Sequence, residues 1–364
     1  MTRWLKRAGG GGVLVILLVG AVQADPITIT DLAGRTLKLD GPAKRIVTFP
    51  VPIAATVITL DQSPDRLVGI HPESKIAIDN DILGEFFPKA RDIESGILAG
   101  GATRGSQPNV EVVKASQPDL VIKWGHAGEE HISPLEKAGL NVALIVRGPN
   151  DEYMREALSM IGTAIGRSDR ARMLIDWRDA VSAEISAGIK TVPDSKRLKA
   201  AYFFYSTDEL WTEGGGTYGD WQLRHVGARN AATEIQSWKK VSHEQVAAWN
   251  PEVIFISTFE PDAHVNHVHN HPILDDTIAA KTKRVYQIPL GGYRWDPASP
   301  ESPLAWMWYT EILYPDVFDF DIRAEIKEWY PKLYGHTPSE EQIDKILQMD
   351  MNSGSAGYER FAAK

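Results

Sequence analysis

NVEVVKASQPDLVI at residues 109–122 is matched 133 residues later by SHEQVAAWNPEVIFI at residues 242–256. Each stretch has an acidic residue near its start, the apolar spacing of a short helix, a proline, and then an apolar β-branched run. The proline ends the helix, and the run that follows predicts a buried parallel strand. The period exceeds the roughly 20 to 50 residues of stacked repeat units. The repeat therefore predicts two similar α/β lobes with a cleft between them.

The first 24 residues indicate export. Arg3, Lys6 and Arg7 precede an apolar run at 13–19, and small residues surround Gln23-Ala24, as in a secretory signal peptide. The run is shorter than the ~20 residues that a membrane span needs. Because the chain has no cysteine, neither a disulfide nor a lipid-modified N-terminal cysteine can form. We expect cleavage after Ala24 and a soluble protein free in the periplasm, not a lipoprotein.

Composition narrows the possible functions. The chain has 364 residues, with 48 acidic against 39 basic side chains and a net charge of −9, which argues against nucleic-acid binding. A chain of this length is expected to form two cores. Eleven tryptophans and eleven tyrosines exceed what core filling usually needs. Some of these aromatic side chains are therefore expected to line a site.

Patterning along the chain predicts an α/β fold in five parts. A hairpin is expected at 27–39, and a single helix of more than 20 residues is expected from Ser168 onward. Trp306 and Trp308 lie within a helical pattern and are expected to pack in the core. The expected parts are a signal peptide at 1–24, an N-terminal lobe at 25–150, an inter-lobe helical segment at 151–193, a C-terminal lobe at 194–318, and a helical tail at 319–364.

Four features carry a resemblance to a known family: RIVTF at 45–49, the two repeated units, the single long helix between them, and WDPASPESPLAWMWYTEILYPDVF at 295–318. The chain resembles the helical-backbone class (class III) of periplasmic binding proteins, which serve ABC importers of ferric siderophores, haem, cobalamin and metal chelates. EIKEWYPKLYGHTPSEEQIDKIL at 325–347 is most similar to the iron-complex and metal-chelate branch. The resemblance implies two Rossmann-like lobes with mainly parallel sheets, joined by one long α-helix, and a ligand cleft between the lobes.

Glu111 and Glu244 occupy matching positions in the two repeats. In the family that the chain resembles, one surface glutamate on each lobe docks on the membrane subunits of the transporter. Independently of that resemblance, two symmetric carboxylates suit two symmetric basic sites, because charge complementarity sets register and association rate. The alternative is that each carboxylate only stabilises a helix N-terminus. We favour docking.

Polar and aromatic groups that follow predicted strands are the candidates for ligand binding, because such positions enter the cleft in this architecture. Trp124 and Trp238 also match cleft tryptophans in the cobalamin-binding branch of the family. An arginine beside two aromatic rings suits a flat or anionic metal complex. Ordinary core packing is the alternative for any one ring. The candidates are His71, Trp124, His126, Tyr205, Trp211, Trp238, Tyr293, Arg294 and Trp295.

Four histidines lie within eight residues, at His264, His267, His269 and His271. If the segment is extended, the last three point to one side, and imidazole suits zinc, copper, nickel or iron. The segment could therefore bind metal. Solvated loop histidines are an equally good interpretation, because no carboxylate stands at a defined spacing.

These observations predict a non-catalytic, monomeric carrier that captures a metal complex, with iron the expected metal, and delivers it to an ABC permease with its cytoplasmic ATPase. No catalytic cofactor is expected. Haem or a corrinoid is an alternative ligand, with axial ligation by Tyr or His; an oxyanion such as molybdate is another. A metal-dependent hydrolase is less favoured, because the sequence has no G-x-S-x-G nucleophile motif and TEGGGTYGD at 212–220 lacks the lysine of a phosphate-binding loop.

Overall fold

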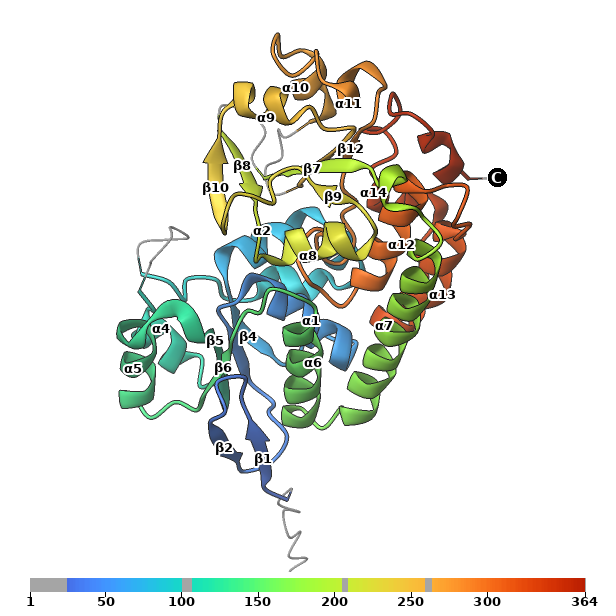
Figure 1. Cartoon of the computed structure of the whole chain (residues 1–364). Helices are drawn as coiled ribbons and strands as arrows, with labels where there is room; N and C mark the ends of the chain where they lie inside the picture. The colour runs from blue at the N-terminus through green and yellow to red at the C-terminus, as the bar shows by residue number, and fades with distance from the viewer. Residues whose placement is uncertain (1–24, 100–106, 205–208, 259–263, 364) are drawn as a thin grey trace, which may run out of the picture.

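The computed structural model describes residues 25–99, 107–204, 209–258 and 264–363. Two four-stranded parallel sheets lie in the two halves of the chain (Figure 1). The first has the order β4-β3-β5-β6, built from β3 (Ile46–Thr48), β4 (Leu67–Ile70), β5 (Leu120–Trp124) and β6 (Val142–Ile145). The second has the order β12-β11-β7-β9, built from β7 (Lys199–Phe203), β9 (Arg229–Asn230), β11 (Val253–Ile256) and β12 (Val285–Gln287). The predicted α/β class is confirmed.

Two antiparallel pairs accompany the sheets. The predicted N-terminal hairpin forms from β1 (Ile27–Thr30) and β2 (Thr36–Leu39), and it turns at Gly34, whose φ of 79° is one that glycine adopts without strain. The second pair joins β8 (Leu210–Glu213) to β10 (Trp238–Val241) beside the second sheet. Glu213 at the end of β8 and Trp238 at the start of β10 lie beside the space between the lobes.

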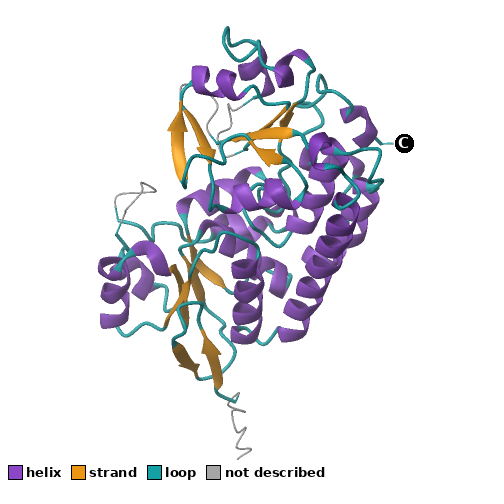
Figure 2. Ribbon diagram, viewed as in Figure 1, coloured by secondary structure: helices purple, strands orange, loops and turns teal. Residues whose placement is uncertain are grey.

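Helices surround both sheets (Figure 2). Before the long helix they are α1 (Val51–Asp61), α2 (Pro72–Asn80), α3 (Ile82–Phe86), α4 (Val110–Ala115), α5 (Glu129–Lys137) and α6 (Glu152–Ala164). The second half adds α8 (Tyr218–His225), α9 (His243–Trp249), α10 (Val265–His269) and α11 (Ile278–Lys281). The last part of the chain forms α12 (Ser302–Leu313), α13 (Ile322–Tyr334) and α14 (Glu340–Ile346).

The two repeats fold alike at their helix starts. The side chain of Asn109 accepts a hydrogen bond from the backbone N–H of Val112 at the start of α4. Ser242, at the matching position, accepts one from Gln245 at the start of α9. These caps satisfy backbone donors that the first helical turn leaves without partners.

The repeats also end alike. Gln117 and Asn250 precede the two prolines and have left-handed backbones, with φ of 48° and 47°. The acidic residue after each proline then anchors the neighbouring strand. Asp119 accepts hydrogen bonds from the backbone N–H groups of Lys44 and Arg45 before β3, and Glu252 accepts one from Lys199 at the start of β7. The shared acid is therefore a structural feature of each lobe.

The long helix α7 (Ser168–Ile189) runs along one side of the molecule between the two halves (Figure 1). Its 22 residues span roughly 33 Å at 1.5 Å per residue. Arg178, in the middle of α7, pairs with Asp151 and donates to the backbone carbonyl of Ser299 in the second half. The expected helical connector is confirmed, and it is tied to both sides.

The tail forms a second link between the halves. Lys345 of α14 pairs with Glu85 of α3 at 2.8 Å, and Gln62 donates to the carbonyl of Pro331 in α13. One large hydrophobic core runs through both halves, and smaller cores lie on the outer face of each sheet. Trp306 and Trp308 are buried in the shared core, as expected. The lobes are therefore packed together over a wide area.

Candidate functional site

A cavity of about 580 Å³ lies between the lobes, at the carboxyl ends of the parallel strands. Residues before α7 form one wall, and residues after α7 form the other. The first wall consists of Val51, Pro52, Trp124, His126, Arg147 and Tyr153. The second wall consists of Tyr202, Phe204, Glu213, Ser237, Trp238, Tyr293, Asp296 and Pro297.

Arg147 supplies the positive charge of the cavity. It follows β6, and its guanidinium carbon lies 5.8 Å from the centre of the Trp238 ring, a cation–π contact that crosses the cleft. Within the described chain the guanidinium has no hydrogen bond or ion pair. His126 stands on the same wall, and burial together with the charges of Arg147 and Lys123 lowers its pKa. The first wall is therefore basic, with a histidine that stays neutral at neutral pH.

Two carboxylates line the opposite wall. Glu213 is 4% exposed and Asp296 is 3% exposed. Asp296 Oδ2 accepts hydrogen bonds from the hydroxyls of Tyr202 at 2.6 Å and Ser257 at 2.7 Å, and Glu213 Oε2 accepts one from the backbone of Gly219 at 2.6 Å. Burial raises the pKa of both acids. The second wall is therefore acidic.

Phenols and indoles complete the cavity. Tyr153 and Tyr293 are both buried, and neither hydroxyl is hydrogen-bonded to a described residue. Burial raises the pKa of Tyr153 to about 12 and raises that of Tyr293 further, so both phenols are neutral near pH 7. Trp124 and Trp238 add flat apolar surface. The cavity can thus hold a compact polar ligand against aromatic faces.

Four of the residues predicted to bind ligand line this cavity: Trp124, His126, Trp238 and Tyr293. Tyr205 lies outside the described residues. Trp211 lies in β8, where its indole N–H donates to Glu209, and it does not line the cavity. His71 begins α2, and its ring accepts a hydrogen bond from the backbone of Glu73. His71 follows β4 as expected but caps a helix, and Trp211 lies within a strand.

Arg294 and Trp295 are placed differently from the prediction. The Trp295 indole is fully buried and donates to the carboxylate of Glu301 at 2.6 Å, behind the cavity wall. Arg294 is 4% exposed and donates to the carbonyl of Thr258, and it is not among the lining residues. The guanidinium that reaches the cavity is that of Arg147. The sequence analysis expected a cavity arginine at position 294, whereas the structure brings Arg147 to the cavity lining.

Sequence reasoning missed the six other polar or charged residues of the lining: Arg147, Tyr153, Tyr202, Glu213, Ser237 and Asp296. The rule that polar groups after strands enter the cleft would have found Arg147, which stands two positions after the end of β6. Glu213 ends β8, an antiparallel strand that the repeat does not contain. Tyr153 and Tyr202 lie within regular elements, where the sequence alone gives no sign of a site.

The histidine-rich segment is helical, so the extended arrangement considered for it is not found. The helix α10 spans Val265–His269. His264 accepts a hydrogen bond from the backbone of Asn266 at the helix start, and the His271 ring stacks on that of His243 at 3.8 Å. Among the described residues, no group of three His, Cys, Asp or Glu side chains is placed to hold a metal ion.

Glu111 and Glu244 are exposed in the first turns of α4 and α9. Neither forms an ion pair with a described residue. Both carboxylates are therefore available on the surface, one on each lobe.

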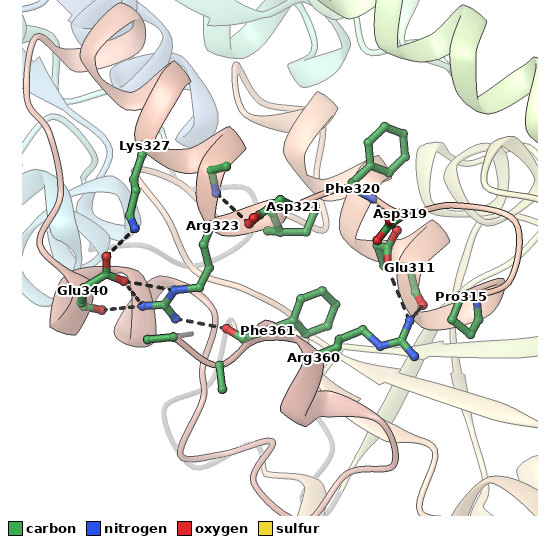
Figure 3. Close-up of a pocket in the computed structure, with 14 residues that line it drawn as sticks. Glu311, Pro315, Asp319, Phe320, Asp321, Arg323, Lys327, Glu340, Arg360 and Phe361 are labelled. Carbon is green, nitrogen blue, oxygen red and sulfur yellow. Dashed lines mark hydrogen bonds and ion pairs between the residues drawn. The ribbon is translucent and has the colours of Figure 1, made fainter.

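A second hollow of about 530 Å³ lies on the tail (Figure 3). Its cations are already paired: Arg323 with Glu340 and Asp344, Lys327 with Glu340, and Arg360 with Glu311. An anionic ligand would have to displace these acids. This hollow has the features of a structural ion-pair network.

A family model described as periplasmic binding protein matches residues 100–290. The chain belongs to this family. This periplasmic binding protein is 25% identical, over 328 residues, to the molybdate-binding protein MolA of Haemophilus influenzae, which covers 84% of this chain and 90% of the relative. It is 27% identical over 263 residues to the cobalamin-binding protein of Halobacterium salinarum, with 68% of each chain covered.

A solved structure agrees with the fold of this periplasmic binding protein. The periplasmic solute binding protein from Veillonella parvula superposes with a TM-score of 0.81 at 26% identity, covering 90% of this chain and 99% of that one. Within the described residues, no helix is both long and apolar enough to cross a membrane.

Proposed function

We propose that this periplasmic binding protein is the substrate-binding component of an ABC importer and carries a metal complex, without catalysing a reaction. The observation that carries the proposal is Arg147, a cation that lines the inter-lobe cavity over the Trp238 ring and forms no hydrogen bond or ion pair with a described residue. A guanidinium that faces a cavity and has no hydrogen-bond acceptor from the protein can bind an anionic ligand through paired hydrogen bonds. The rings of Trp124 and Trp238 then provide surface for an organic chelator.

The relatives support a small metal-containing ligand without naming it. MolA is a molybdate binder and the Halobacterium protein is a cobalamin binder. A cavity of about 580 Å³ lies within the usual 300 to 1,000 Å³ of small-molecule sites. We place a ferric siderophore or a similar metal chelate ahead of haem, a corrinoid and a bare oxyanion.

Delivery would use the two exposed glutamates. We propose that Glu111 and Glu244 dock on the membrane subunits of the permease, which is driven by a cytoplasmic ATPase. Export would follow cleavage after Ala24, and the mature chain would act as a monomer with lobes at 25–150 and 194–318. The histidines of α10 would not hold the transported metal.

Metal analysis and native mass spectrometry of protein purified from its own periplasm test the proposal. We expect one metal per chain, with a ligand mass that disappears on denaturation. Calorimetry with ferric citrate, nickel–bis(L-histidine), haem, cyanocobalamin and molybdate would then rank the ligands. A protein that carries no metal and binds none of the five would contradict the proposal.

A further inference from the structure

We propose that the cavity binds the two ends of its metal complex in chemically opposite ways. Arg147 would donate hydrogen bonds to anionic oxygens of the ligand, and Asp296 would accept a hydrogen bond from a donor group of the ligand. The inference rests on the proposed transport function and narrows its substrate class. The ligand would be a metal chelate that carries carboxylates together with coordinated amine N–H groups or water. A bare tetrahedral oxyanion, which offers acceptors only, would be rejected.

The first end is formed by the cavity wall whose residues precede α7 in the chain. Arg147 offers five N–H donors, and no described residue accepts from them. His126 stands beside it as a neutral imidazole because its pKa is lowered, so the fixed charge of this wall belongs to the guanidinium. A carboxylate of the chelate can accept two parallel hydrogen bonds there.

The second end is Asp296, which is only half satisfied by the protein. The hydroxyls of Tyr202 and Ser257 both donate to Oδ2, while Oδ1 accepts no hydrogen bond although the residue is 3% exposed and lines the cavity. A buried carboxyl oxygen without a donor is costly. An N–H group or a metal-bound water would supply the missing donor.

Arg147 and Asp296 both lie near Tyr293. The charges of Arg147 and Asp296 both shift the pKa of Tyr293, together with that of Arg294. The hydroxyls of Tyr153 and Tyr293 are neutral and have no partner among the described residues. They can therefore form hydrogen bonds with the middle of the ligand, one from each wall. A compact chelate can therefore reach both ends at once.

The same arrangement disfavours an oxyanion. Placing a molybdate oxygen against Arg147 brings the other oxygens toward Asp296 and Glu213, whose lone pairs or charges repel them. Replacing the acceptor at position 296 with an amide should weaken this discrimination.

The test compares two probes, nickel–bis(L-histidine) and molybdate, by calorimetry on the full mature chain. The wild type should bind the nickel chelate at least 10-fold more tightly than molybdate. Asp296→Asn should lose at least 10-fold in affinity for the chelate and gain at least 10-fold for molybdate, because the amide offers a donor. A gain of binding cannot come from misfolding.

Arg147→Gln tests the other end of the site, and it should weaken the binding of both probes. If Asp296→Asn does not fold, the wild-type preference for the nickel chelate over molybdate still tests the proposal. Molybdate binding more tightly than the chelate to the wild type would overturn the two-ended site while leaving the transport function standing. Binding of neither probe, combined with metal-free protein from the periplasm, would overturn both.

Discussion

The two lobes are alike on the outside and unlike where they face each other. On the outer side, the helix cap, the left-handed residue, the proline and the strand-anchoring acid recur at an interval of 133 residues, with matching hydrogen bonds. At the cleft, the first lobe presents Arg147 and His126, whereas the second presents Glu213 and Asp296.

This difference separates two requirements. Docking on two related membrane subunits, as we propose, would favour equivalent surfaces, and the repeat places one exposed glutamate on each lobe, at Glu111 and Glu244. Recognition of one asymmetric molecule favours unequal walls, because each end of the ligand needs its own complement. The scaffold is therefore duplicated, and the site built upon it is not.

The largest expected effect concerns the shared outer surface. Reversing both Glu111 and Glu244 to Arg should abolish stimulation of transport by the permease in proteoliposomes, because two attractive contacts become repulsive. Ligand affinity should change less than 2-fold, since both side chains are exposed away from the cavity. Reversal of the exposed Glu156 and Glu359 is the matched control. Full stimulation by the Glu111/Glu244 variant would refute the docking role.

The next effect tests the basic wall. Arg147→Gln should weaken binding of nickel–bis(L-histidine) by about 10- to 100-fold, the range for a lost charge-assisted hydrogen bond. Arg294→Gln should change the affinity of the folded protein by less than about 3-fold, because Arg294 does not line the cavity. Calorimetry on both variants decides between the two arginines. If Arg294→Gln lost more affinity than Arg147→Gln, Arg294 would be the arginine that binds the ligand.

A third prediction concerns Lys123, which is buried behind the basic wall with its ammonium 4.3 Å from the centre of the Phe49 ring. Burial lowers the pKa of Lys123 to about 8. The folded state therefore binds fewer protons than the unfolded state between about pH 8 and the ordinary value near 10.5. The destabilisation is complete below pH 8 and disappears as the pH rises through that window.

Lys123→Met should accordingly raise the free energy of unfolding at pH 7 by about 1 to 3 kcal/mol. The gain should shrink toward zero near pH 10.5. Urea titrations of both proteins at pH 7 and pH 10 measure it. A destabilised variant at pH 7 would show that the ammonium contributes favourable interactions in the fold.

The smallest effect is expected at the histidine-rich segment. Replacing His264, His267, His269 and His271 with Gln should change affinity for the nickel chelate by less than about 2-fold, because α10 lies away from the cavity walls. Metal stoichiometry should also remain unchanged. Loss of the bound metal in this variant would place the metal on protein imidazoles.

Much of the scaffold could be predicted, because its signals are local. A proline after an apolar helical spacing, followed by a β-branched run, identified both β5 and β11, and the run after Ser168 identified α7. Four of the residues that line the cleft were predicted, from their position after strands or from the family resemblance. Trp306 and Trp308 followed from helical spacing.

The rest of the site depends on tertiary contacts that no local pattern encodes. In the run from Tyr293 to Asp296, only the first and last residues reach the cavity, while Trp295 turns inward to the carboxylate of Glu301. Which arginine faces the cavity therefore depends on how the loop at 293–296 packs against the start of α12. Glu213 enters through the β8–β10 pair, which has no counterpart in the repeat.

The central claim is that a metal complex binds between the two unlike walls. Anomalous diffraction at the nickel edge, from crystals of the mature protein grown with nickel–bis(L-histidine), tests it most directly. We predict one strong peak in the cleft, with carboxylate oxygens toward Arg147 and coordinated amine groups toward Asp296. A peak at the histidines of α10, with an empty cleft, would contradict the account.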